Sequence, residues 1–233
     1  MYQAKLIKKE RLKDQTWILD FSCPWLTWTP GQHVDLNLQV ENKNMSKAFT
    51  IISSPTSGVI RLITRHKQSS SYKEKLLSLA PSEWLTMSLP YGHTYGDLEG
   101  DKLVFISSGV GAAGLWPLME TLETYDWIHV DRSSHLFDFL RGDRRKRASL
   151  VNRHSLYRHL DQVIQVYLLK SEDPKFLVCG SQTFVGDIYG HLMDMGFSDE
   201  DMITEGKGFQ SLCGCHPDRG CGCGRNLMPM SGA

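Results

Sequence analysis

The N-terminal part of the chain alternates between apolar and polar positions over short stretches, a pattern typical of strands with one buried face. The alternation is clearest in VDLNLQV and VIRLITR. Turn-forming residues separate the stretches at 30–31, 41–44 and 55–58. The pattern predicts one short helix at 71–79 and strands at 2–9, 16–22, 33–39, 47–53, 59–66 and 85–90. This arrangement favours a small antiparallel β-barrel.

The pattern changes after residue 102. LVFIS at 103–107 is an uninterrupted apolar run, which is typical of a strand buried in a parallel sheet. A glycine loop follows, and then the sequence predicts helices up to about 124 and at 183–195 and strands at 127–130, 163–169 and 175–179. Alternation of strands and helices indicates a parallel α/β domain. We therefore predict a barrel domain over 1–98, an α/β domain over 99–209 and a cysteine-rich tail over 210–233.

The glycine loop reads GVGAAG and lies between the apolar strand and the next helix. Glycines at this spacing permit a tight turn and a close approach of the backbone to a pyrophosphate, and the helix N-terminus directs its N–H groups at the anion. A glycine-rich turn without any ligand is the alternative. In this strand–loop–helix context we interpret Gly109, Gly111 and Ala112 as part of a nucleotide site.

The following strand ends in Asp131-Arg132-Ser133. An acid at this place can hold the ribose of an adenosine, and an arginine can hold a 2′-phosphate, so the choice of coenzyme stays open. A basic run then follows, which is either a solvated loop or a docking patch for a phosphate or an acidic partner. It consists of Arg141, Arg144, Arg145, Lys146 and Arg147.

Composition narrows the classes of function. The 233 residues carry 26 lysines and arginines against 26 acidic residues, and this balance argues against a dedicated nucleic-acid binder. A content of 41% hydrophobic and 22% charged residues is that of a globular protein. No apolar stretch is long enough for a membrane span, and the N-terminus lacks the apolar core of a signal peptide. We expect a cytoplasmic protein.

The tail concentrates most of the cysteines of the chain, together with His216. Four thiols and an imidazole suit zinc or an iron–sulfur cluster. Disulfides, redox-active thiols or an incidental tail are the alternatives. The predicted metal ligands are Cys213, Cys215, Cys221 and Cys223.

The stretch KAFTIISSP at 47–55 resembles the flavin motif Arg-x-Tyr-Ser/Thr of the ferredoxin–NADP reductase family. The resemblance implies a flavin held by Lys47, Ala48, Phe49 and Thr50, with FAD expected and FMN as the alternative. Lys47 keeps the charge of the family's arginine without its bidentate fork. Phe49 keeps an aromatic face, and Thr50 keeps a hydroxyl for the reactive edge of the isoalloxazine.

Further segments resemble the same family. The segment 63–72 is similar to its pyrophosphate cradle, which implies cofactor contacts from Arg65, His66, Ser70, Ser71 and Tyr72. LPYGH at 89–93 resembles its Gly-Pro-x-Gly turn. Arg132-Ser133 is similar to its adenosine-phosphate contact, and FLVCGS at 176–181 resembles its strand ending in Cys-Gly-Pro. That last match implies that Cys179 and Gly180 lie near the nicotinamide.

The resemblance implies hydride transfer between NADPH or NADH and flavin N5, followed by electron transfer to a redox protein partner or a small acceptor. Thr50 and Cys179 are then the candidate catalytic residues. Some family members carry a C-terminal 2Fe–2S cluster. A simple Rossmann dehydrogenase fits less well, because its glycine loop would come near the start. A non-catalytic subunit with a degenerate flavin site and a metal-binding tail is the second hypothesis.

Overall fold

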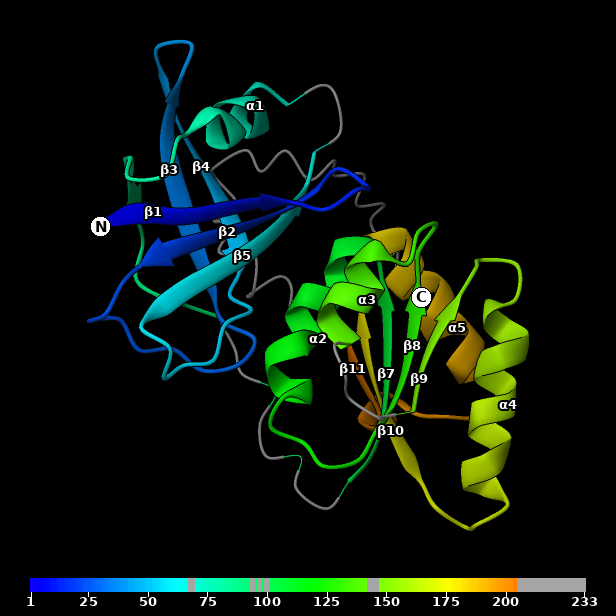
Figure 1. Ribbon diagram of the computed structural model, residues 1–233. Coiled ribbons are helices and arrows are strands. Elements are labelled where there is room, and N and C mark those ends of the chain that lie inside the picture. The colour runs from blue at the N-terminus through cyan, green and yellow to red at the C-terminus, as the bar shows by residue number, and fades with distance from the viewer. Residues whose placement is uncertain (67–69, 93–94, 96–97, 99–100, 142–146, 205–233) are drawn as a thin grey trace, which may run out of the picture.

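The structure, a computed structural model, describes residues 1–66, 70–92, 95, 98, 101–141 and 147–204 and contains two sheets of different kinds (Figure 1). The first sheet is antiparallel and has the strand order β4-β3-β6-β1-β2-β5. Its elements are β1 (Tyr2–Arg11), β2 (Thr16–Ser22), β3 (His33–Val40), β4 (Lys43–Thr50), β5 (Val59–Arg65), α1 (Ser71–Ser78) and β6 (Trp84–Met87). The sheet curls until Ile51 pairs with Leu62. The predicted barrel is thereby confirmed.

The strand at the flavin motif differs from the prediction. It begins at Lys43 and ends at Thr50, instead of spanning 47–53. Glu41 and Asn42 form a tight hairpin turn with φ values of 47° and 61°, so pairing with β3 starts directly after them. A longer turn was expected there because residues 41–44 are all polar. They are polar because this end of β4 is exposed.

Helix α1 closes one end of the barrel. Tyr72 and Leu76 are fully buried, and the Tyr72 hydroxyl donates to the Leu36 carbonyl at 2.6 Å. The side chains of Val34 and Leu36 meet them from β3. This packing fixes the N-terminus of α1 beside strand β4 (Figure 1).

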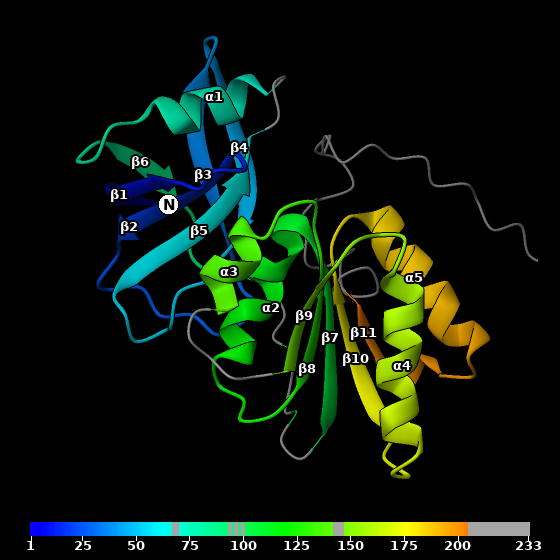
Figure 2. The ribbon, with the colours of Figure 1, turned by 45° about the vertical axis from the view of Figure 1, so that its right-hand side comes forward.

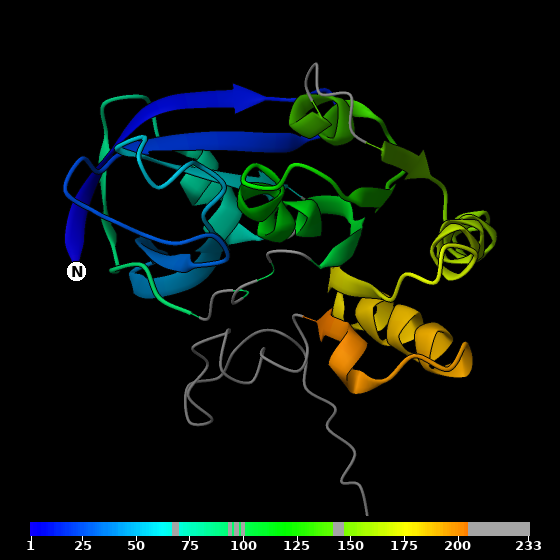
Figure 3. The same cartoon turned by 90° about the horizontal axis from the view of Figure 1, so that it is seen from below.

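The second sheet is parallel and has the strand order β11-β10-β7-β8-β9. Its elements are β7 (Lys102–Ser108), η1 (Gly109–Gly111), α2 (Ala112–Met119), β8 (Asp126–Val130), α3 (His135–Arg141), β9 (Arg147–Val151), α4 (Leu156–Leu168), β10 (Pro174–Cys179), α5 (Gln182–Asp194), η2 (Asp199–Asp201) and β11 (Met202–Thr204). Helices α2 and α3 cover the face toward the barrel, and α4 and α5 cover the other (Figures 2 and 3). The predicted parallel α/β domain is confirmed.

One predicted strand of this domain is wrong. Residues 163–169 fall in helix α4 and its C-cap. The residues that α4 buries are Leu156, Leu160, Ile164 and Tyr167, a spacing of three and four that belongs to a helix. The β-branched residues of 163–169 favour a strand when this stretch is read alone. The helical spacing becomes visible only when the preceding residues from Leu156 onward are included. Helix α2 also ends earlier than expected, at Met119.

The two domains share an apolar core. Ile18, Ile52 and Ile63 from the barrel cluster with Phe105 and Leu115 from the second domain. Alternate residues of β7 point to opposite faces, so Leu103 and Phe105 face this shared core, whereas Val104 and Ile106 face α4 and α5. The carboxyl ends of β7, β8 and β10 are thus held against the barrel. Within the described residues, no helix is both long and apolar enough to span a membrane.

Candidate functional site

The predicted flavin residues divide between the two faces of β4. Phe49 pairs with Val34 and Lys47 with Leu36, so their side chains lie on the face toward the barrel interior and α1. Ala48 and Thr50 lie on the opposite face. Lys47 and Ala48 are exposed and Thr50 is half-buried. The strand therefore offers two separate surfaces.

The surface toward α1 suits a phosphate. The Lys47 ammonium lies 5.6 Å from the centre of the Tyr72 ring. Tyr72 belongs to the first turn of α1. The Ser70 side chain caps α1 by accepting from the Lys73 backbone at 3.3 Å, and the N–H groups of exposed Ser71 and of Tyr72 have no partner within the helix. An ammonium beside a helix N-terminus attracts an anion. This donor set fits the pyrophosphate of FAD.

His66 and His33 supply a second indication of a ligand. Both rings have a buried Nδ1 atom without a hydrogen-bond partner among the described residues. Buried polar atoms are nearly always paired, so each of these atoms is available to a bound group. His66 was among the predicted cofactor residues. His33 was not among them, because a single histidine on an alternating strand is typical of an ordinary structural residue.

His33 lies directly opposite Thr50 on the neighbouring strand. It is 8% exposed, and its backbone exchanges two hydrogen bonds with Tyr91, of 2.8 and 2.9 Å. Burial lowers the pKa of His33 below its ordinary value, in spite of the nearby Asp35 carboxylate. The His33 imidazole therefore stands on the same face of the sheet as the predicted catalytic hydroxyl of Thr50.

Phe49 packs against the first turn of α1. It is 8% exposed and stacks on Tyr72, with ring centres 6.4 Å apart and planes 24° apart. The Phe49 ring belongs to the apolar core of the barrel. The donors on this surface suit a phosphate, while the stacking of Phe49 on a flavin stays a prediction.

The glycine loop and the end of β10 meet at the carboxyl edge of the parallel sheet. A Cβ atom on Gly111 would lie 2.7 Å from the Gly180 Cα and 2.8 Å from the Cys179 carbonyl oxygen. Strand β7 lies at the centre of the sheet. The chain adds β8 and β9 on one side of it and then crosses over to add β10 and β11 on the other side. Such a switch point is where open α/β sheets bind their ligands. Gly109, with a φ of 53°, and Ala112 belong to the same loop.

Cys179 is fully buried in the core that the two domains share. Its side chain therefore faces the barrel rather than α4 and α5. The structure brings Cys179 and Gly180 together with Gly109, Gly111 and Ala112, five of the predicted site residues.

Arg65 and Asp131 form an ion pair between the domains. Two guanidinium nitrogens of Arg65 donate to the Asp131 carboxylate at 2.6 and 3.2 Å, and one also donates to Asp14 at 2.7 Å. Ser133 donates to the same Asp14 oxygen at 2.9 Å. Arg132 is exposed and uses its backbone N–H on Asp131. Arg65, Asp131 and Ser133 thus belong to one hydrogen-bonded cluster, in which Asp14 connects Arg65 to Ser133.

Behind Asp131 lies a buried polar pair on β7 and β8. The Ser107 hydroxyl and His129 Nδ1 are 2.8 Å apart, and Trp127 donates to the Ser107 oxygen at 2.9 Å. With the imidazole proton on Nε2, Nδ1 accepts from the Ser107 hydroxyl, whose oxygen accepts in turn from Trp127. That Nε2 atom lies 3.7 Å from the Asp131 carboxylate.

The pair at Asp131 should make folding sensitive to acid. Burial by itself raises the pKa of Asp131, but the neighbouring His129, the hydrogen bonds from Arg65 and the Arg132 N–H outweigh it and lower the pKa. The pKa of Asp14 is lowered in the same way, by Thr16, Ser133 and Arg65 against burial. A lowered folded-state pKa stabilises the protein above the unfolded value near 4, and this contribution is lost as the pH falls through the lowered value.

We therefore expect the free energy of unfolding to decrease as the pH falls from about 5 to 3. Asp131→Asn should lower this free energy by about 2 kcal/mol at pH 7, because Arg65 loses a charged partner, and should make its decrease with acid less steep. Urea unfolding of both proteins over a pH series measures both effects. An equal slope in the variant would contradict the assignment to Asp131.

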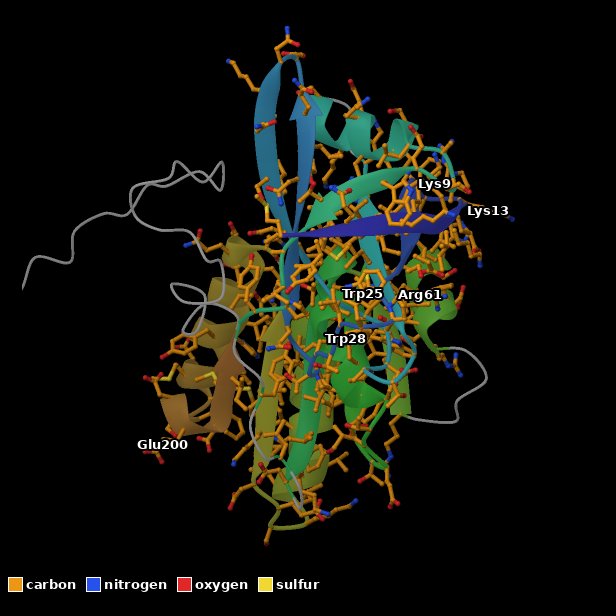
Figure 4. The ribbon with its side chains drawn as sticks, turned by 90° about the vertical axis from the view of Figure 1, so that its left-hand side faces the viewer. Lys9, Lys13, Trp25, Trp28, Arg61 and Glu200 are labelled. Atoms are coloured by element: carbon orange, nitrogen blue, oxygen red, sulfur yellow. The ribbon has the colours of Figure 1, made fainter. Side chains whose placement is uncertain are left out.

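A cavity of about 470 Å³ lies at another part of the domain boundary. Its polar lining includes Arg61, which pairs with Asp20 through two hydrogen bonds of 2.7 and 2.8 Å. Trp116 and Phe139 line it from α2 and α3. Figure 4 shows Arg61 in the same part of the first domain as Trp25 and Trp28. None of the predicted site residues lines this cavity.

Two predicted groups lie largely outside the described residues. The tail with Cys213, Cys215, Cys221 and Cys223 is one, and Arg144, Arg145 and Lys146 of the basic run are the other. Arg141 and Arg147 are described and exposed. Over the described part of the chain, no group of three or more histidine, cysteine or acidic side chains is arranged to hold a metal.

Comparison with known proteins agrees with this geometry. Residues 3–95 match the family described as oxidoreductase FAD-binding domain. No curated protein matches the sequence. Among solved structures, the ferredoxin NADP+ reductase of Neisseria gonorrhoeae with bound FAD and NADP has a TM-score of 0.75 at 14% identity, over 88% of this chain and 97% of that one.

Two further structures are similar. The CS-b5R domains of human Ncb5or, in an NAD+ form, give a TM-score of 0.74 at 18% identity, over 87% of this chain and 68% of that one. The flavohem-like FAD/NAD binding domain of the nitric oxide dioxygenase of Vibrio cholerae gives 0.72 at 14% identity, over 87% and 97%. At these identities the likeness establishes the fold.

Proposed function

We propose that the protein transfers hydride between NAD(P)H and FAD, because residues 3–95 match the family described as oxidoreductase FAD-binding domain and the chain is similar in fold to a ferredoxin NADP+ reductase. The observation that carries this proposal is the position of the glycine loop. Gly111 packs on Gly180 at the switch point of the parallel sheet, at the edge that faces the flavin domain. The same loop lies close to the first domain, since a Cβ atom on Gly109 would be 3.6 Å from the Arg65 side chain of β5.

Each side chain then has a distinct task. Lys47 and the N-terminus of α1 bind the FAD pyrophosphate, with His66 and Ser70 nearby in the chain. Thr50 contributes its hydroxyl to the reactive edge of the flavin, and its neighbour His33 offers the free Nδ1 atom to the same edge. When FAD is bound, it accepts the hydride and releases electrons to the next acceptor. The shared apolar core around Cys179 keeps water away from this region.

For the coenzyme we propose NADPH. The exposed Arg132 side chain follows the strand end where an adenosine is bound in this fold class, and a guanidinium recognises a 2′-phosphate in a bidentate manner. Arg132→Ala should raise the KM for NADPH about tenfold, because a hydrogen bond to a charged group contributes about that factor to binding. The KM for NADH should be unchanged. Steady-state kinetics with both coenzymes measure this. Equal turnover with NADH, unaltered by the substitution, would refute it.

The electron acceptor is proposed to be a redox protein, with the cysteines of the tail as ligands of a 2Fe–2S cluster or of zinc. The first experiment is a visible spectrum of anaerobically purified protein before and after NADPH. A flavin band that bleaches supports the reductase. Additional broad absorbance supports an iron–sulfur cluster. A colourless protein that binds neither added FAD nor NADPH would refute the reductase in favour of the non-catalytic module.

A further inference from the structure

Arg65, the last residue of β5, has its guanidinium between the two domains. Its Nε donates to Thr16 of the first domain at 3.1 Å, and Nη2 donates to Asp14 at 2.7 Å and to Asp131 of the second domain at 2.6 Å. Nη1 adds a second bond to Asp131 at 3.2 Å. The planar guanidinium of an arginine presents several N–H donors and can therefore bind two carboxylates at the same time.

The cluster is closed and largely shielded from water. The side chains of Arg65, Asp14 and Asp131 are 22%, 11% and 5% exposed. Ser133 donates across the boundary to Asp14, so the first domain is tied to the second by two different residues. Removing one partner of a shielded ion pair leaves the other charge unpaired, which is costly, so this cluster favours the observed arrangement of the two domains.

The position of the cluster links it to three parts of the proposed site. The Arg65 Nη1 atom lies 3.6 Å from the point that a Cβ atom on Gly109 would occupy, at the first glycine of the nucleotide loop. Asp131 and Ser133 flank Arg132. The Arg65 carbonyl accepts from the Lys73 ammonium at 2.8 Å, which ties it to the helix at the flavin phosphate surface.

We propose that Arg65 is a positioning residue that sets the distance between the flavin and the nicotinamide, rather than a ligand of the flavin phosphate. This inference rests on the proposed function. The guanidinium is already occupied by Thr16, Asp14 and Asp131, so it has no spare fork for a phosphate. It holds the nucleotide loop and the flavin domain at one fixed separation, on which the rate of hydride transfer depends steeply.

The test compares Arg65→Met with Arg61→Met. Arg61 lies on the same strand and forms a bidentate ion pair with Asp20 inside the first domain, so both variants leave a buried carboxylate without its arginine. In stopped-flow mixing with NADPH, Arg65→Met should lower the limiting rate of flavin reduction roughly 10- to 100-fold, with unchanged flavin content, absorption spectrum and KM. Arg61→Met should leave the limiting rate at the wild-type value. Arg65→Lys keeps the charge without the fork and should fall between wild type and Arg65→Met.

A second measurement needs no cofactor. Hydrogen exchange on the flavin-free protein should accelerate several-fold at 12–16 and 130–135 in Arg65→Met and not in Arg61→Met, because the contacts between these segments are lost. Equal rates and equal exchange in the two variants would overturn the inference. Loss of FAD from Arg65→Met would also overturn it, in favour of phosphate binding. If wild-type flavin is not reduced at all, the proposed function fails, while the exchange measurement still decides whether Arg65 clamps the domains.

Discussion

Gly111→Ala is expected to destabilise the protein by about 3 kcal/mol and to abolish binding of the dinucleotide. The added Cβ would lie 2.7 Å from the Gly180 Cα and 2.8 Å from both the Gly180 nitrogen and the Cys179 oxygen. All three are backbone atoms at the end of β10, so no side chain can rotate away. The loop after β7 and the turn after β10 must separate, which distorts the crevice of the proposed nucleotide site. Urea unfolding and calorimetric titration with NADP+ measure the two effects.

Gly186→Ala is the matched control. Gly186 is exposed on α5, and a Cβ atom there would meet nothing within 4 Å. Alanine favours the helix over glycine by about 0.5–1 kcal/mol, so this variant should be slightly more stable and bind NADP+ normally. Normal stability and binding in Gly111→Ala would show that the two turns can move apart freely, and would contradict the packing described for them.

Lys47→Ala is expected to weaken FAD binding by about 10- to 100-fold, because one charge-assisted hydrogen bond to a phosphate contributes about 1.5–3 kcal/mol. Lys47 is exposed and its ammonium lies above the Tyr72 ring, beside the N-terminus of α1. Removing an exposed side chain should leave the stability of the apoprotein within about 0.5 kcal/mol of wild type. Fluorescence titration of apoprotein with FAD measures the affinity, and thermal unfolding measures the stability.

Lys43→Ala separates this contact from a general loss of positive charge. Lys43 is also exposed on β4 and lies four residues before Lys47, at the hairpin end of the strand. It should bind FAD as wild type does. If both variants lose the same affinity, the effect comes from net charge alone. If neither loses affinity, the pyrophosphate lies elsewhere.

Much of the architecture follows from local patterns. The period of two in VIRLITR and VDLNLQV gives strands that the structure confirms, since alternate side chains must face one buried side. The apolar run before Gly109 becomes the central strand β7, buried on both faces. The prediction of a strand at 163–169 was wrong because helix and strand cannot be distinguished in a short apolar segment. In the structure this segment belongs to helix α4, which packs against the sheet.

The candidate site was less predictable, since its partners lie far apart in the chain. The motif at 47–50 lies on one strand, but its residues alone do not predict that Phe49 stacks on Tyr72. Arg65 and Asp131 each resembled a cofactor contact on their own. Their pairing depends on how one domain docks on the other, which no local spacing encodes.

By itself, the sequence determined the order of the antiparallel and parallel sheets, the position of the glycine loop and the strand that carries the motif at 47–50. These properties are local, because periodicity and glycine spacing act over a few neighbouring residues. Only the tertiary structure decided that Gly111 must be a glycine, that His33 stands beside Thr50, and that Arg65 joins the domains. These are contacts between distant segments, and they exist only because the shared apolar core brings the segments together.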